Sequence, residues 1–259
     1  MVLISVAAFV ASALTFVSGF GLGTLLTPVF ALFFPVETAI AATAVVHLAN
    51  NLFKLWLTRR TADWRIVARF GLPATIAALA GAWVLVVSSG LPALVQYELA
   101  GQPRRVTVVK VVIGALTVAF ALLESSRRFR AVQLPVRYLP WGGVLAGFFG
   151  GLSGIQGALR SAFLIKAGLS KEAYVATGVV CSVLVDLARL LVYGSSQIVS
   201  VADDASRDVA MVAAAASASA FAGAVVGARL LKNLTLASVQ AAVSYLLMAI
   251  GLALAAGLL

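Results

Sequence analysis

The sequence predicts an all-α polytopic membrane protein with two inverted repeats, each a glycine-broken, re-entrant helix pair followed by three transmembrane helices. Three observations predict this fold: the apolar composition, the lengths of the apolar segments, and an internal repeat with basic residues gathered on one side. Of 259 residues, 62% are hydrophobic and 11% are charged, against roughly 45–50% and ~25% in soluble domains. So few charges cannot cover a soluble globule of this size, so lipid must face most of the surface.

The same composition excludes a cytoplasmic enzyme, a nucleic-acid-binding domain and a disordered chain. The chain has one cysteine, Cys181, and one histidine, so we expect no disulfide, no metal site and no cofactor. No P-loop and no G-x-S-x-G nucleophile elbow occurs in the sequence, so neither an ATPase nor an intramembrane hydrolase is expected. We therefore expect that the protein is not an enzyme.

Six apolar segments have the length of a membrane-spanning helix, which needs about 20 residues. Charged residues, proline or glycine bound each of them. The expected spans are 36–57, 66–88, 106–124, 171–193, 208–230 and 236–257.

Two longer apolar stretches, 2–34 and 138–168, are interrupted by glycine-rich runs. As one helix, the first stretch would be about 50 Å long, whereas the hydrocarbon core is ~30 Å thick. Three glycines alternate in Gly19-Phe20-Gly21-Leu22-Gly23, and a second run extends from Gly150 to Gly157. Because glycine disfavours a helix interior, we expect each stretch to form two shorter helices joined at a break.

Similar motifs follow in the same order in the two halves of the chain. Single matches are weak in so apolar a sequence, but an ordered series supports a duplicated half. Among them, Ser18-Gly19-Phe20-Gly21 matches Ser153-Gly154-Ile155-Gln156, and Ala80-Gly81-Ala82 matches Ala222-Gly223-Ala224.

The expected organisation is a first repeat over 1–126, a cytoplasmic connecting loop over 127–137 and a second repeat over 138–259. If each broken stretch is re-entrant, each repeat crosses the membrane three times and the repeats are inverted. This topology puts 14 of the 19 lysines and arginines on the cytoplasmic side and 4 outside, against 10 and 8 if the broken stretches cross fully. The positive-inside rule favours the inverted arrangement.

Three segments together resemble the TauE/SafE family of anion transporters over nearly the whole chain. The resemblance implies transport of sulfite, small organosulfonates or related anions. It is carried by Gly19-Phe20-Gly21-Leu22-Gly23 with Leu25-Leu26-Thr27-Pro28, by Asn50…Arg59-Arg60…Asp63-Trp64-Arg65, and by Gly147-Phe148-Phe149-Gly150-Gly151-Leu152-Ser153-Gly154-Ile155-Gln156-Gly157-Ala158.

The two helix breaks are the expected anion site. Half-helix N-termini in inverted-repeat transporters point at anions near the midplane; alternatively, the glycines only permit tight helix crossing. Arg160, one turn past the second break, could bind an anion in a two-pronged geometry or extend to the interface. Gln156 could donate to the ligand or satisfy the broken backbone. The expected substrate-binding residues are Gly21, Gly23, Thr24, Asn50, Asn51, Gln156, Gly157 and Arg160.

A polar stripe on segment 36–57 consists of His47, Asn50, Asn51 and Lys54, at i, i+3, i+4 and i+7. At membrane depth it must face protein or water. Lys54 is expected to extend to the inner interface. His47 and, on segment 171–193, Asp186 are the candidates for proton coupling. The alternatives are a hydrogen-bonded packing role for the histidine and an i, i+3 ion pair of Asp186 with Arg189.

We therefore expect a secondary transporter that moves a small anion, sulfite or a small organosulfonate, by alternating access. Without organelle-targeting features, it is expected as a multi-pass protein of a bacterial inner membrane. Its expected partners are the anionic substrate and the lipid bilayer, with no nucleic acid; a homodimer stays open. The alternative is a passive anion channel or a non-catalytic membrane subunit of a larger complex.

Overall fold

The computed structural model describes residues 2–18, 22–58, 61–126, 128, 132, 134–196, 204–230 and 236–259. The structure is 79% helical, with one two-stranded sheet in the described part. Three of the described helical segments are long and apolar enough to cross a membrane: Trp64–Ser89, Val108–Ser125 and Lys171–Gly194. The predicted all-α polytopic membrane fold is thus confirmed.

The first half begins with two short helices and continues with three long helical segments. The second of these long segments is continuous through α4, a π-helical turn and α5, and a β-hairpin separates it from the third. The elements are α1 (Val2–Ser18), α2 (Leu22–Ala31), α3 (Val36–Thr58), α4 (Trp64–Ile66), η2 (Val67–Gly71), α5 (Leu72–Ser89), β1 (Val95–Leu99), β2 (Gln102–Val106) and α6 (Val108–Ser125).

The second half repeats this order without the hairpin. It contains η3 (Val136–Tyr138), α8 (Leu139–Ser153), α9 (Gly157–Leu164), α10 (Lys171–Gly194), α11 (Asp204–Leu230) and α12 (Leu236–Ala255). A helix therefore covers each of the six predicted spans, with ends that differ by a few residues. The domain boundaries themselves stay a prediction.

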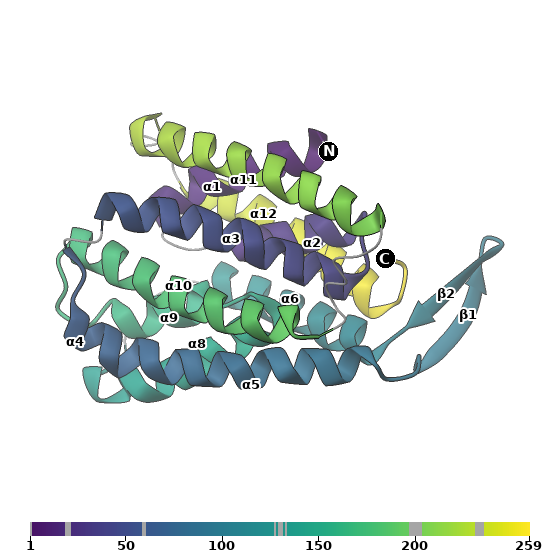
Figure 1. The fold of residues 1–259 in the computed structure, drawn as a ribbon, viewed down its shortest axis with the longest axis horizontal. Coiled ribbons are helices and arrows are strands. Elements are labelled where there is room, and N and C mark those ends of the chain that lie inside the picture. The colour runs from purple at the N-terminus through teal and green to yellow at the C-terminus, as the bar shows by residue number, and fades with distance from the viewer. Residues whose placement is uncertain are drawn as a thin grey trace.

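The third helices of the two halves, α3 and α10, lie side by side and run in opposite directions (Figure 1). The backbone N–H of Asp63, just after α3, donates to Oγ1 of Thr177 near the start of α10, at 2.9 Å. At the other end, which we call the hairpin end because it carries β1 and β2, the Tyr97 hydroxyl donates to the Ala256 carbonyl just after α12 (2.6 Å). Glu37, at the start of α3, interacts there with Lys110, at the start of α6.

The broken helix pair α8–α9 returns to the end from which it enters. The N–H of Leu134, just before α8, donates to the carbonyl of Ala162 near the end of α9, at 3.3 Å. In the first half, the N-terminus and the start of α3, which follows α2, both lie toward the hairpin end (Figure 1). The two pairs thus enter from opposite ends, as expected for inverted repeats.

Each half packs its fourth helical segment, the one that contains α5 or α11, against the first helix of the other half. A Cβ atom on Gly81 in α5 would collide with the carbonyl oxygen of Phe148 in α8. A Cβ atom on Gly223 in α11 would collide in the same way with the carbonyl oxygen of Phe9 in α1. The sequence repeat pairs these two glycines, so equivalent residues make reciprocal contacts.

The hairpin was not predicted from the sequence. Its strands pair in antiparallel register, with Val95 opposite Val106 and Leu99 opposite Gln102. The two-residue turn, Ala100 and Gly101, has positive φ at both positions (54° and 75°), as in the type I′ turns that match strand twist.

Candidate functional site

The break between α8 and α9 is built on one left-handed residue. Gly154 has φ 78° and ψ 0°, a conformation that glycine adopts without the steric cost of a Cβ atom. Ser153 stabilises the turn: its hydroxyl donates to the Phe149 carbonyl at 2.8 Å and accepts from the Ile155 N–H at 3.3 Å. The second half-helix then begins at Gly157, as predicted from the sequence.

The N-terminus of α9 has no side-chain cap. Gln156 occupies the N-cap position and makes no capping hydrogen bond, whereas serine, threonine, asparagine or aspartate would normally accept from the first amides. The first backbone N–H groups of a helix have no partner inside the helix and carry a partial positive charge. This end of α9 therefore presents donors toward the break.

The predicted polar stripe of α3 lies inside the protein. Asn50, Asn51 and Lys54 are buried, and His47 is partly buried. Oδ1 of Asn50 accepts from the Ser12 hydroxyl of α1 at 3.1 Å. Lys54 therefore does not extend to the interface, contrary to the expectation from its place near the helix end.

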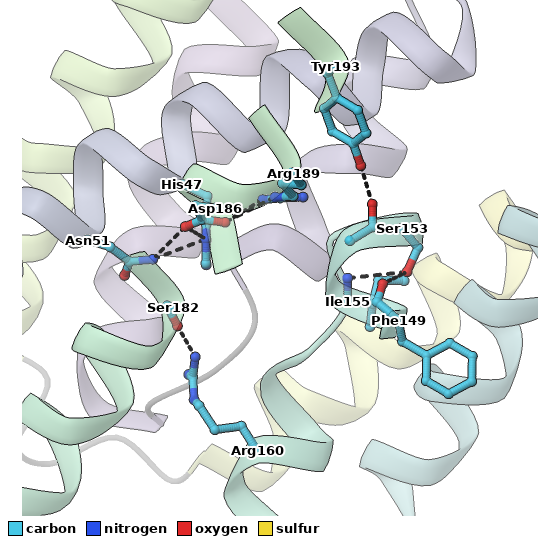
Figure 2. A network of polar contacts seen from close by, with 11 residues as sticks. His47, Asn51, Phe149, Ser153, Ile155, Arg160, Ser182, Asp186, Arg189 and Tyr193 are labelled. Atoms are coloured by element: carbon cyan, nitrogen blue, oxygen red, sulfur yellow. Dashed lines mark hydrogen bonds and ion pairs between the residues drawn. The ribbon is translucent and has the colours of Figure 1, made fainter. Parts of the chain in front are cut away.

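Asp186 of α10 is the centre of a buried network that joins α3 and α10 (Figure 2). Nδ1 of His47 lies 2.7 Å from its Oδ2, and Nδ2 of Asn51 donates to the same oxygen at 3.1 Å. Nε and Nη2 of Arg189 donate to Oδ1 at 3.1 and 2.7 Å. The structure thus contains the i, i+3 ion pair of Asp186 with Arg189. It also places His47 and Asp186, the two candidates for proton coupling, in contact.

Arg160 turns inward from α9 onto α10. It is 9% exposed, and its Nη1 donates to the Ser182 hydroxyl, one turn before Asp186 (Figure 2). Its Nε lies near Gly178, where an added Cβ would be 3.4 Å away. Arg160 also interacts electrostatically with Lys54. The side chain of Arg160 therefore does not extend to the membrane interface, which was one of its two predicted roles.

The buried charge of the described residues is mostly positive. The buried lysine, arginine, aspartate and glutamate side chains of the described residues are Lys54, Arg160, Arg189 and Asp186. Burying like charges in a protein is unfavourable unless an opposite charge lies near them. Three cations against one carboxylate form a region that attracts an anion. Among the described residues, no group of three or more His, Cys, Asp or Glu could hold a metal ion.

Several buried hydrogen-bond donors in this region have no partner in the described structure. They are Nδ2 of Asn50, Nε2 of Gln156 and Nη1 of Arg189. Buried polar groups of proteins are nearly always hydrogen-bonded, so each of these donors needs an explanation. A ligand with acceptor oxygens would supply one.

The structure brings part of the predicted site together. Asn51, His47 and Asp186 are in direct contact, Arg160 contacts the helix of Asp186, and Gln156 and Gly157 lie at the break. Gly21 lies outside the described residues. Gly23 and Thr24 are in the first turn of α2, and the side chain of Thr24 is outside the described part.

Three side chains of the cluster were not predicted as site residues. Arg189 was interpreted only as the partner of Asp186, and Ser12 and Ser182 were not singled out. The signal for Arg189 was present, since an arginine inside an apolar span is costly and usually functional. Nothing in the local pattern marked the two serines.

A family model described as "Sulfite exporter TauE/SafE" matches residues 4–254 of the chain. No curated protein and no solved structure gives a significant match. The family match confirms the resemblance drawn from the paired glycine-rich segments. It describes membrane transporters, not enzymes, so the expectation that the protein is not an enzyme is confirmed as well.

Proposed function

Since the chain belongs to the sulfite exporter TauE/SafE family, we propose that it is a secondary transporter that carries sulfite or a small organosulfonate across a bacterial inner membrane by alternating access. Its partners are then the anion and the lipid bilayer. The repeat boundaries at 126 and 138 and the predicted binding residues belong to this proposal.

The observation that supports it best is the excess of buried positive charge beside a broken helix. Lys54, Arg160 and Arg189 come from α3, α9 and α10, and Asp186 is the buried carboxylate among them. A small oxyanion would offset this charge and accept hydrogen bonds from donors that lack a partner. A cation would add to this charge, and a neutral solute could accept hydrogen bonds but would not offset the charge.

The arrangement of the helices suits alternating access. The antiparallel helices α3 and α10 come from opposite halves and carry the polar cluster at their contact (Figures 1 and 2). In inverted-repeat transporters, one repeat rocks against the other around a central site, which opens it to each side in turn. A tilt of α3 against α10 would expose the cluster first to one end and then to the other.

Flux into proteoliposomes tests the proposal. We expect saturable uptake of ³⁵S-labelled sulfite, and Arg160→Gln with Gly157→Leu should lower it about tenfold or more because a charge-assisted contact and the close approach to the α9 amides are both lost. Arg65→Gln, which removes an exposed cation, is the matched control. Wild-type vesicles that take up neither sulfite nor methanesulfonate would contradict the proposal, and currents far above carrier turnover would identify a channel instead.

We also propose that His47 and Asp186 carry a proton during transport. Their 2.7 Å contact lets either group hold the proton. The other charged or titratable groups around them are Lys54 on α3, Arg160 on α9, and Arg189 and Tyr193 on α10. Protonation of Asp186 would remove the negative charge next to Arg189 and favour anion entry.

A pH gradient tests the coupling. We expect an imposed gradient to drive sulfite uptake against its concentration gradient in wild-type vesicles, and His47→Gln to abolish this accumulation while downhill flux continues. Thr75→Ala on α5, whose hydroxyl bonds its own helix at 2.7 Å, is a control for a polar change in a span. Equal accumulation in His47→Gln and wild type would disprove the coupling.

A further inference from the structure

The guanidinium of Arg189 has three neighbours: the Asp186 carboxylate, the Tyr193 hydroxyl and the break at Gly154. Its Nε and Nη2 donate to Oδ1 of Asp186, and its Nη1 has no hydrogen-bond partner although the side chain is fully buried. A Cβ atom on Gly154 would lie 2.6 Å from this Nη1. One edge of the guanidinium therefore faces the carboxylate, and Nη1 lies against the break between α8 and α9.

This orientation of Arg189 is held in place on both sides. The Tyr193 hydroxyl, one turn further along α10, donates to the Gly151 carbonyl at the end of α8 (Figure 2). Asp186 is in turn held by His47 and Asn51 from α3. Because its partners fix it, Arg189 presents Nη1 at the break without the entropy that a free arginine would lose on binding.

Gln156 supplies a second donor at the same break. The residue is 3% exposed, its Nε2 has no hydrogen-bond partner, and its side chain does not cap α9. A Cβ atom on Gly150 would lie 3.2 Å from Cδ of Gln156 and 3.1 Å from Cγ1 of Val185. The amide group therefore lies between the end of α8 and α10, one turn along α10 from Arg189.

We propose that Arg189, Gln156 and the first backbone amides of α9 form a subsite for one oxyanion group at the Gly154 break. The inference rests on the proposed function and names the binding residues that distinguish its substrate. Asp186 acts in it as a positioning residue, because its own oxygens are occupied by Arg189, His47 and Asn51.

The chemistry of these donors selects a class of ligand. An arginine nitrogen on α10, a carboxamide at the N-cap of α9 and the amides of its first turn are separate donors, so a group with several oxygens can satisfy more than one of them at once. A sulfite, a sulfonate or a carboxylate has such oxygens, whereas a halide is a single point acceptor. The absence of a side chain at Gly154 leaves the approach to Nη1 open.

Binding to the protein in nanodiscs tests the subsite, with sulfite, methanesulfonate and chloride as probes in calorimetry. Gln156→Leu and the paired change Asp186→Asn with Arg189→Gln should each weaken sulfite and methanesulfonate binding about tenfold or more, since each removes buried donors. The paired change removes one positive and one negative charge, so the net buried charge is kept. Gln96→Leu and Arg105→Gln, in the exposed hairpin, are the matched controls.

The outcomes separate this inference from the proposed function. Unchanged sulfite affinity in either test variant overturns the subsite, whether or not the protein transports sulfite. A variant that loses chloride affinity by the same factor as sulfite affinity overturns it as well. The wild-type protein could bind sulfite, and the test variants could bind it more weakly, while wild-type vesicles take up no sulfite. That result would support the subsite and overturn the proposed transport. If the paired variant does not melt cooperatively, Gln156→Leu alone decides.

Discussion

Single glycines on one face of α8 set how closely the two halves of the protein approach each other. Cβ atoms on Gly147 and Gly151 would collide with the carbonyl oxygens of Ala74 and Ala78 in α5. In a membrane, where apolar side chains gain little by leaving lipid, small residues at helix contacts permit the close packing that holds helices together. Of the glycines in the run from Gly150 to Gly157, Gly151 therefore permits tight helix crossing, which was the alternative interpretation, while Gly154 forms the break.

This packing predicts the effect of one added methyl group. Gly147→Ala should lower the free energy of unfolding by about 1–3 kcal/mol, as overpacking does, because the Ala74 backbone cannot move aside without bending α5. A thermal melt in detergent measures it. Gly90→Ala, where the nearest atom would be 3.7 Å from the new Cβ, should melt within about a degree of wild type; equal losses in the two variants would contradict the packing argument.

Also at the residue scale, the sequence predicted the polar stripe of α3 but not its partners. Helical spacing alone puts His47 and Asn51 on one face, and the structure has both on Asp186. Which residue of another helix meets that face depends on the rotation and depth of α10, and no local pattern encodes these. The same limit explains why Arg189 was assigned to Asp186 only, and its approach to Gly154 was missed.

At the scale of elements, polar residues at the helix starts connect the two halves. Oδ1 of Asp63 accepts from the N–H groups of Arg65 and Ile66 at 2.9 and 3.1 Å and so caps α4. Its own N–H donates to Thr177 of α10. Ser170 caps α10 by accepting from the Ala173 N–H at 3.1 Å. Helix starts of both halves are thus fixed at the same end of the molecule.

The cap at Asp63 predicts a measurable loss of stability. Asp63→Ala should cost about 1 kcal/mol, since two amide donors at the start of the α4–α5 segment lose their acceptor. Asp63→Asn should recover most of it, because the asparagine carbonyl accepts in the same place. Denaturant unfolding would measure both. A loss of the same size in Asp63→Asn would show that the charge of Asp63, and not its capping bond, is responsible.

The hairpin shows why one element was missed. Its turn has Ala100 and Gly101 at positions that need positive φ, where asparagine-glycine or aspartate-glycine is the usual sequence signal. The strands are short, and both are mostly exposed, so no alternation of buried and exposed residues marked them. The six long helical segments, in contrast, were predicted from the sequence, because the length of an uninterrupted apolar segment is enough to predict a spanning helix.

At the scale of the whole molecule, the antiparallel halves place particular residues at one end. Thr61 and Asp63 contact the start of α10, with the Thr61 hydroxyl 3.5 Å from the Glu172 carbonyl. Arg65 and Lys171 therefore lie toward the same end, and the hairpin lies at the other (Figure 1). This is the distribution that the positive-inside rule predicted for inverted repeats.

Cysteine labelling in intact cells tests the topology. In a Cys181→Ser background, Arg65→Cys and Lys171→Cys should be protected from a membrane-impermeant maleimide added outside, because the predicted inverted topology puts both residues on the cytoplasmic side. Gln96→Cys in the hairpin should react. All three positions are exposed, so disrupted cells should label each of them. External labelling of Lys171→Cys while Arg65→Cys stays protected would disprove the inverted arrangement, since a fully crossing broken pair puts these two residues on opposite sides.

The sequence by itself determined the membrane environment, the approximate lengths of the six long helices and the break at Gly154, whereas the first predicted break, at residues 19–21, lies outside the described residues. Each of these follows from local quantities: apolar length against bilayer thickness, and the cost of glycine within a helix. Only the tertiary structure decided that Asp186 meets His47, that Arg189 reaches Gly154, and that Lys54 and Arg160 turn inward. The reason is physical: these contacts join segments more than twenty residues apart or depend on helix rotation, and the packing of whole helices sets them.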